Sequence, residues 1–511
     1  MGLIKFLKGV FKRMIAPEDI SKIFNINPAV SSTMRNKIEE WESMYKGEAS
    51  WIHDDIHSLG LPSMIASEKA RMATLEMQIK ITGDNERATF IKEQFEKKFL
   101  PKIRENLEYG IALGGFIVKP YVTTGANGYV LEFSFVNAEH FYPLAFSPAG
   151  KIIEAVFVDR ILTKDVIYSK VEHHKLIDNN QIQVSNFAYK KSSDLAGTYN
   201  YSDTELGTQI PLSDVAEWAT LAPTVTLNGI DTLLFAYFKM PQANHIDLES
   251  PLGVSGFSRA EDLIKDADEQ YSNLLWEFDG GQLAVDVDRT AFNVFKDKNG
   301  TDRYELPKYQ NRLFRRNMDL GSGEDGSFYQ IFSPQLRDSS ILNGLNSILM
   351  HIEDVCDLSR GTISMVSYTE ARTATELKIL KQRSYAANRD IQKELERVMV
   401  KTFEIMDKYC DLYQIVPAGK FDVAYAWDDS IIVDKDQERQ VDLLDVQGGL
   451  MSKVEYRMKW FGETEDQANK ALELIFAQQK KDIELQMAGK TSNEQTTLER
   501  ANESKKVTQN I

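Results

Sequence analysis

Residues 258–281 read SRAEDLIKDADEQYSNLLWEFDGG, and residues 339–361 read SSILNGLNSILMHIEDVCDLSRG. Both stretches repeat apolar residues every three or four positions, which is the spacing of an amphipathic helix. The first stretch predicts a helix over 258–280. Ser258 and Glu261 stand at the spacing of a capping box at its start, and two glycines end it.

Residues 281–337 separate this helix from a second one, which we expect over 338–358. Within the insert, β-rich runs at 290–295 and 304–306 flank Lys298-Asn299-Gly300, a turn signal typical of a hairpin. The sequence therefore predicts a pair of helices that carries a small β module at its far end.

A single very long helix is expected over 371–413. Residues 362–416 contain no Gly and no Pro, and the apolar spacing stays helical from Ile391 to Leu412. A helix of about 40 residues is about 60 Å long, which exceeds the diameter of a small domain. Such an element spans an assembly more naturally than it packs inside one globule. A polar loop, 359–372, connects it to the helix before.

The remaining sequence predicts a β-rich middle between helical ends. Helices are expected over 33–46, 64–80 and 84–113, and strands over 116–122, 129–136, 152–162, 166–176 and 182–189 in an antiparallel meander. Short helices are expected over 436–447, 452–460 and 464–480, and the polar residues 481–511 are expected to be disordered.

Composition bounds the class of protein. The chain has 511 residues, of which 42% are hydrophobic and 27% charged, with a net charge of −16. These values indicate a folded protein with two or more subdomains. No apolar run approaches 18 residues, so we expect no membrane-spanning helix. Cys356 and Cys410 stand on helical apolar faces and are interpreted as buried thiols in a reducing compartment.

The basic amphipathic segment Leu3–Ile15 leaves two interpretations open. Its cations interrupt the apolar run and no small-residue cleavage site follows, which argues against a signal sequence. It could lie on a membrane surface, or it could dock as a terminal helix on its own subunit or a neighbour.

Candidate chemistry is sparse. No G-x-x-x-x-G-K-[ST] motif occurs, so nothing in the sequence indicates a phosphate cradle. His53 and His57 have a spacing that metal sites use, but no third ligand cluster accompanies them, and a polar surface turn is the favoured interpretation. We therefore expect no catalytic, cofactor-binding or metal-binding residues in this chain.

Four stretches together resemble the portal proteins of tailed double-stranded DNA phages, in the form found in phages of Gram-positive bacteria. Trp41 to Gly47 is similar to the family's W-x-x-x-Y-x-G signature, and residues 61–71 are similar to the helix after it. GIALGGFIVKPY at 110–121 resembles the family's helix-to-strand transition. The order of helix, insert, helix, loop and long helix within 258–413 is the fourth likeness and the most specific.

The resemblance implies an α+β portal fold with a β-rich wing, a helical stem, a small α/β clip, a long wing helix and a helical crown. The implied parts are the helical start of the wing (1–113), the β-rich wing (114–257), the first stem helix (258–280), the clip (281–337), the second stem helix (338–358), the tunnel loop (359–372), the long wing helix (371–413), the crown (414–480) and a tail (481–511).

The implied function is structural. Twelve copies would form a ring at one capsid vertex of the virion, after assembly in the host cytoplasm. Double-stranded DNA would be packaged and ejected through the ring without sequence recognition. The implied partners are the large subunit of the terminase, the scaffold and major capsid proteins, and head completion or adaptor proteins. An acidic lining would let DNA slide, although the net charge equally fits a role in solubility.

Two groups of residues are candidates for the site. The position of the tunnel loop implies DNA-facing roles for Arg360, Thr362, Ser364, Ser367, Tyr368, Thr369 and Arg372. In the clip, Arg312, Arg315 and Arg316 could meet phosphates, an acidic adaptor, a neighbouring subunit's carboxylates or a partner within the subunit.

Two other classes of function remain as alternatives. A DNA-processing enzyme subunit would require clustered carboxylates that hold a metal, and none are visible in the sequence. A peripheral membrane scaffold would rest on the first 15 residues alone.

Overall fold

The computed structural model divides the chain into two compact units, Met1–Asp428 and Asp429–Ile511. It describes residues 15, 17–26, 28–125, 128–163, 166–178, 180–192, 205–282, 284–288, 293–305, 314–317, 329–365, 374–427 and 435–481. Most of the basic N-terminal segment and the tail after residue 481 therefore lie outside the described residues, and the predictions for them stay predictions.

The first unit begins with helices. These are α1 (Pro17–Phe24), α2 (Ser32–Tyr45), α3 (Leu61–Thr74), α4 (Glu86–Gln94) and α5 (Leu100–Leu113). A π-helical turn, Phe95–Phe99, joins α4 to α5. It precedes Pro101, which lacks the N–H that a regular helix would use at that point. The turn brings Phe95 and Phe99 together in the core, with ring centroids 4.7 Å apart.

The prediction of a helix over 64–80 is wrong at its end. Helix α3 stops at Thr74, and β1 (Met77–Thr82) follows it. The stretch MQIKIT alternates apolar and polar residues, which is the period of a strand. Strand β1 pairs antiparallel with β16 (Asp422–Trp427), more than 300 residues away in the chain. This pairing decides its conformation.

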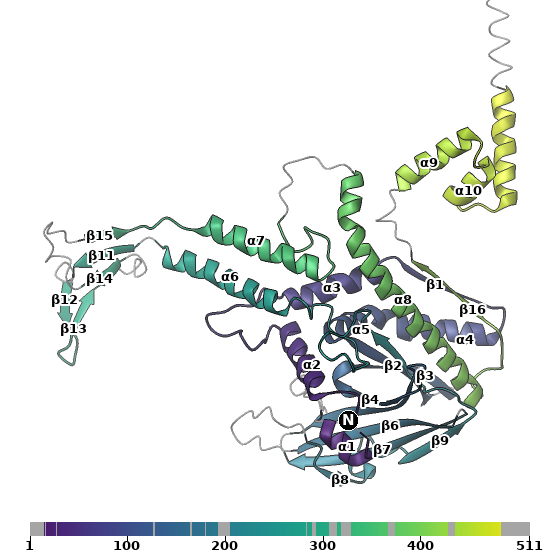
Figure 1. Cartoon of the computed structure of the whole chain (residues 1–511), viewed down its shortest axis with the longest axis horizontal. Coiled ribbons are helices and arrows are strands. Elements are labelled where there is room, and N and C mark those ends of the chain that lie inside the picture. The colour runs from purple at the N-terminus through teal and green to yellow at the C-terminus, as the bar shows by residue number, and fades with distance from the viewer. Residues whose placement is uncertain are drawn as a thin grey trace, which may run out of the picture. The chain divides into compact units, whose positions relative to one another are not determined.

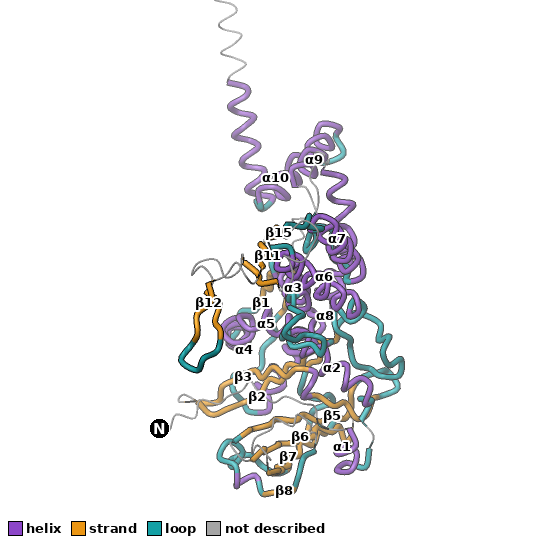
Figure 2. The backbone as a smooth tube through the Cα atoms, turned by 90° about the vertical axis from the view of Figure 1, so that its left-hand side faces the viewer, coloured by secondary structure: helices purple, strands orange, loops and turns teal. Residues whose placement is uncertain are grey.

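The β-rich wing contains two sheets where the sequence predicted one meander. The described strands are β2 (Gly115–Gly125), β3 (Gly128–Asn137), β4 (Phe141–Phe146), β5 (Ile152–Leu162), β6 (Val166–Asp178), β7 (Gln181–Ser192), β8 (Thr208–Ile210), β9 (Thr224–Asn228) and β10 (Ala236–Lys239). One sheet has the order β10-β2-β3, and the other has the order β4-β5-β6-β7-β8 with β9 on β7. The antiparallel run β5-β6-β7 is confirmed. Figure 2 shows these strands gathered in one part of the unit.

A tight glycine contact decides how α5 passes into β2. Gly114 has a φ of +88°, and a Cβ there would lie 2.4 Å from the carbonyl oxygen of Gly253. Only glycine tolerates both the left-handed backbone and this close approach. The helix therefore ends at Leu113, and the chain turns directly into the sheet.

The two helices predicted on either side of the insert are α6 (Glu261–Gly280) and α7 (Asp338–Val355), and they lie side by side (Figure 1). We call them the stem helices, after the part of a portal that the sequence resemblance implies for them. The end of α6 at Gly280 agrees with the sequence prediction, but the predicted capping box is wrong. The Ser258 hydroxyl is buried without a hydrogen-bond partner. The Glu261 carboxylate instead accepts hydrogen bonds from Trp41 Nε1 at 2.5 Å and Lys37 Nζ at 2.6 Å.

The insert between the stem helices forms strands. These are β11 (Ala284–Asp288), β12 (Asn293–Lys296), β13 (Asp302–Glu305), β14 (Phe314–Asn317) and β15 (Tyr329–Phe332). Strand β11 pairs parallel with β14 and antiparallel with β15. Strands β12 and β13 form the predicted hairpin, in which Gly300 has a φ of +79°. None of the described residues of 281–337 is helical.

The predicted long helix is α8 (Ala374–Leu412), with 39 residues. Its apolar face is buried in the second half, where Leu395, Val398 and Ile405 are at most 2% exposed. This face packs on β2 and β10 and on helix α3. The helical period read from the sequence is therefore confirmed.

The second unit contains α9 (Lys435–Gly448), α10 (Lys453–Phe461) and a further helix over 465–481. The first unit extends to Asp428, and β16 within it pairs with β1, while the assignment of 414–480 to a crown stays a prediction. The long-range partner of residues 422–427 could not be read from their own sequence.

Arg87 connects helix α4 to the end of α8. Its side chain is 2% exposed, and its guanidinium donates to Asp407 Oδ1 at 2.5 Å and Asp411 Oδ1 at 2.7 Å. It also donates to the backbone carbonyls of Asp407, Val416 and Pro417. One planar cation therefore satisfies five acceptors at the end of α8 and just beyond it.

We expect Arg87→Ala to lower the free energy of unfolding of the first unit by about 2–4 kcal/mol, because two carboxylates and three backbone carbonyls lose their donor. Arg71→Ala is the matched control. Arg71 pairs only with Glu68 on the surface, and its loss should cost less than about 1 kcal/mol. Scanning calorimetry of both variants is the measurement, and equal losses would contradict this role for Arg87.

Candidate functional site

The loop after α7 begins earlier than predicted. Helix α7 ends at Val355, three residues before the expected 358, and Cys356 is buried at its end. Asp357 then takes a left-handed backbone with a φ of 56°, and the N–H of Leu358 donates to the carbonyl of Glu353. This sharp turn directs the following residues back along the helix that they have just left.

A buried carboxylate holds the first part of the loop. Glu353 is fully buried, and its Oε1 accepts the N–H groups of Ile363 at 2.6 Å and Ser364 at 2.9 Å. Its Oε2 accepts the N–H of Gly361 at 3.2 Å and the hydroxyl of Ser364 at 2.7 Å. We call these four contacts the Glu353 clamp.

A second contact lies further along the loop. The backbone of Met365 donates its N–H to Asn346 Oδ1 at 2.7 Å, and its carbonyl accepts from Asn346 Nδ2 at 3.0 Å. One amide side chain thus satisfies both backbone groups of Met365. The Met365 side chain itself is 78% exposed.

Hydroxyl groups make the described contact between this loop and α8. Ser359 donates to Ser384 at 2.8 Å, and Ser384 donates to the carbonyl of Asp357 at 3.1 Å. Arg360 remains on the side of α7, where its guanidinium forms a two-point ion pair with Asp354 at 2.7 and 3.3 Å. This pair raises the pKa of Arg360 further.

The structure separates the predicted DNA-facing residues into three groups. Arg360 and Thr362 are exposed, with Arg360 paired to Asp354 and the Thr362 hydroxyl donating to the Ser359 carbonyl. Ser364 is 8% exposed and its hydroxyl is part of the Glu353 clamp, and its role toward DNA stays a prediction. Four predicted residues lie outside the described part of the chain, and their roles stay predictions: Ser367, Tyr368, Thr369 and Arg372.

The clip arginines are described only in part. Arg312 lies outside the described residues. Arg315 and Arg316 lie in β14, where their backbones are in register with Asp286 and Val287 of β11. Their side chains are not described, so the alternatives proposed for them from the sequence stay open.

An ion pair that sequence reasoning missed lies where the stem meets the clip. Glu277, near the end of α6, accepts from the Arg337 backbone N–H at 2.8 Å and from its guanidinium at 2.7 and 3.2 Å. These hydrogen bonds hold the pKa of Glu277 below its usual value. The pair closes the neck of the insert just before α7 begins.

The Glu353 clamp also escaped prediction, although the sequence carries a weak signal for it. An acidic side chain in the last turn of a helix is disfavoured by the helix dipole. Its presence at that position indicates a specific set of hydrogen-bond donors. The sequence alone could not show that these donors are backbone amides ten residues further along the chain.

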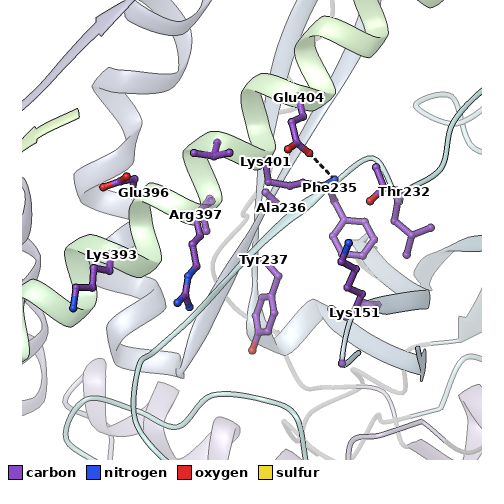
Figure 3. A pocket seen from close by; sticks show the side chains of 15 residues that line it. Lys151, Thr232, Phe235, Ala236, Tyr237, Lys393, Glu396, Arg397, Lys401 and Glu404 are labelled. Carbon is purple, nitrogen blue, oxygen red and sulfur yellow. Dashed lines mark hydrogen bonds and ion pairs between the residues drawn. The ribbon is translucent and has the colours of Figure 1, made fainter. Parts of the chain in front are cut away.

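A groove of about 670 Å³ lies between α8 and β10 (Figure 3). Apolar side chains such as Phe235 line it together with charged groups from α8. These charges are already paired, since Lys401 binds Glu404 at 3.0 Å and Arg397 binds Glu394 at 2.6 Å. We assign no ligand to this groove.

The candidate metal-binding and cysteine residues were located among the described residues. No group of three or more potential metal-binding side chains occurs among them. His53 lies in the predicted turn, paired through its backbone with Ile56. Cys356 and Cys410 are buried free thiols, as predicted, and burial raises their pKa values to about 11 and about 12. None of the helices in the described ranges has the length and apolar character needed to cross a bilayer.

Comparisons with known proteins place these features in a family. A search of curated proteins gives no match. Among solved structures, a chain titled "Neck of native GTA particle computed with C12 symmetry" aligns with a TM-score of 0.36 and 9% sequence identity, over 78% of this chain and 89% of that chain. The family model described as "Phage portal protein, SPP1 Gp6-like" matches residues 29–485, which is most of the sequence. The chain therefore belongs to the SPP1 Gp6-like family of phage portal proteins, a structural component of the virion at the junction of head and tail.

Proposed function

We propose that this portal protein forms a closed ring of twelve subunits at one capsid vertex, through which double-stranded DNA enters and leaves the head. The match to the portal family over residues 29–485 carries this proposal. The order of α6, β insert, α7, loop and α8 supports it, because this order of elements is the most specific resemblance to the portal proteins.

Apolar side chains left exposed on the stem support assembly. Trp276 is 67% exposed, Phe278 43% and Leu342 37% in the single subunit. Large apolar groups gathered on one helical pair are typical of a surface that another protein covers. In a cyclic ring, each subunit presents one such face to the next subunit, which closes the assembly without leaving a free end.

The remaining parts take the roles that the portal family implies. We propose that residues 114–257 form the wing, 281–337 the clip, and 359–372 a loop that faces DNA in the channel. The clip is the proposed docking region for the terminase and, later, for head completion proteins. Scaffold and major capsid proteins are the proposed partners during assembly in the host cytoplasm.

This role requires no bond chemistry in the chain itself. We propose that the separate terminase supplies the energy for packaging, and that the portal contributes a channel and attachment surfaces. The net charge of −16 per chain supports weak, sliding contact with DNA, because like charges oppose tight binding of phosphates.

The first test is assembly. We expect the purified protein to form rings with a central hole in electron micrographs, and light scattering to give a mass close to twelve chains. Trp276→Asp should reduce ring formation, because a charge would be buried in the proposed interface. Tyr129→Asp is the control, since Tyr129 is similarly exposed but lies on β3 in the wing. A monomer at all concentrations, with or without scaffold protein, would contradict the proposal.

The second test concerns the loop. Replacing both Arg360 and Arg372 with Gln should leave rings intact, because Arg360 takes no part in the Glu353 clamp. Packaged DNA in complemented particles should fall several-fold, because cations that contact phosphates are lost. Arg71→Gln combined with Arg104→Gln makes the same charge change on exposed positions of α3 and α5. Equal packaging by the two double variants would remove the role of the loop arginines.

A further inference from the structure

Glu353 occupies a position that is unfavourable for a carboxylate unless the loop is in place. It is fully buried in the last turn of α7, where both desolvation and the helix dipole oppose its negative charge. Its hydrogen-bond donors are three backbone amides and one hydroxyl, all from residues 361–364. Its charge is therefore stabilised mainly by the loop, and the loop backbone is held by its charge.

The donors form a concave set of backbone N–H groups around an anion. Such an arrangement is a strong anchor because hydrogen bonds to an ionised acceptor are about twice as strong as those between neutral groups. Arg360 adds a favourable electrostatic contribution, although its guanidinium is bonded to Asp354. Helix α7 thus holds the backbone and one side chain of the loop at adjacent carboxylates.

Asn346 extends the same attachment along α7. It precedes Glu353 by seven residues, which is about two helical turns, so both side chains emerge from one face of the helix. The loop contacts Glu353 at Ile363 and Ser364 and then Asn346 at Met365. It therefore runs back along α7, antiparallel to the helix axis.

The attachment to α8 is of a different kind. It consists of the hydroxyl of Ser384, which contacts Ser359 and the carbonyl of Asp357 before the clamp begins. The Glu353 contacts of α7 thus include an ionised acceptor, whereas these two contacts with Ser384 of α8 are between neutral groups.

We propose that Glu353 is a positioning residue that makes residues 361–365 a rigid extension of α7, so that force on this loop is transmitted to α7 and the helix pair that it forms with α6. The inference rests on the proposed function, in which DNA passing through the channel exerts the force on the loop. The clamp itself is a property of one subunit, and it can be tested without DNA.

The test compares Glu353→Gln with Asp354→Asn in the full-length protein. Both substitutions replace a carboxylate by its amide at adjacent positions. Hydrogen exchange should become at least about tenfold faster at Gly361, Ile363 and Ser364 in Glu353→Gln, because the ionised acceptor is lost and an NH₂ group faces the amides. Asp354→Asn should leave these amides unchanged, because the amides donate to the Glu353 carboxylate and Asp354 binds the Arg360 guanidinium.

A second variant keeps the inference testable if Glu353→Gln fails to fold. Asn346→Ala should accelerate exchange at Met365 while leaving Gly361 and Ile363 protected. Unchanged exchange in both folded variants would overturn the clamp. Faster exchange throughout α7, at residues 341–352 as well as in the loop, would also overturn it, because Glu353 would then serve the helix and not the loop.

The amount of packaged DNA tests whether the loop transmits force to α7, separately from whether the Glu353 clamp exists. Rings of Glu353→Gln with faster loop exchange should package several-fold less DNA in complemented particles than rings of Asp354→Asn. Normal packaging by Glu353→Gln rings with an unclamped loop would overturn the transmission of force. A failure to form rings by the wild-type protein would instead contradict the proposed function, while the exchange result would still decide the clamp.

Discussion

The attachment of the first stem helix to the N-terminal segment is the constraint on which the rest of the structure depends. Glu261 binds Trp41 and Lys37, and about two turns further on Asp268 accepts from Trp51 Nε1 at 3.0 Å and the Leu59 N–H at 2.7 Å. Burial raises the pKa of Asp268, and these donors oppose the shift. Two carboxylates on one helix thus fix its rotation and its position against the wing. Helix α7 packs on α6, and the clip and the loop follow from that pair.

The same type of hydrogen bonding recurs along the two stem helices. At Glu261, Asp268, Glu277 and Glu353, a helical carboxylate accepts hydrogen bonds from a segment that is distant in sequence or lies beyond a turn. A carboxylate can accept several donors at once, so it joins irregular backbone to a helix where an apolar contact could not satisfy the exposed N–H groups. Because the pKa of Glu277 is lowered, its contribution to stability is present above the ordinary glutamate range and is lost as the pH falls through the lowered pKa.

Helical and strand periods were readable from the sequence because they are local. The register of α8, the hairpin at Gly300 and the run β5-β6-β7 depend on apolar spacing and turn residues. The predictions were wrong where a residue distant in sequence determines the local structure. Glu261 fits a capping box but binds Trp41 instead, and residues 77–80 become a strand because β16 pairs with them. Glu353 was missed for the same reason, since its partners are backbone amides that carry no side-chain signature. The tunnel-loop residues were predicted from the family resemblance, and the hydrogen bond between Ser364 and Glu353 could not be predicted in that way.

The ion pair between Arg360 and Asp354 affects how tightly the loop of the proposed channel could bind DNA. Half of the Arg360 side chain is exposed, and its partner Asp354 is 35% exposed. An exposed ion pair of this kind is weak, so exchanging Asp354 for a passing phosphate changes the free energy little. A free arginine would bind each phosphate more tightly and resist movement. Asp354 competes with phosphate for Arg360, and Glu353 fixes the backbone of the loop. In the proposed channel, Arg360 would therefore keep a constant position and bind each phosphate weakly, which favours sliding of DNA.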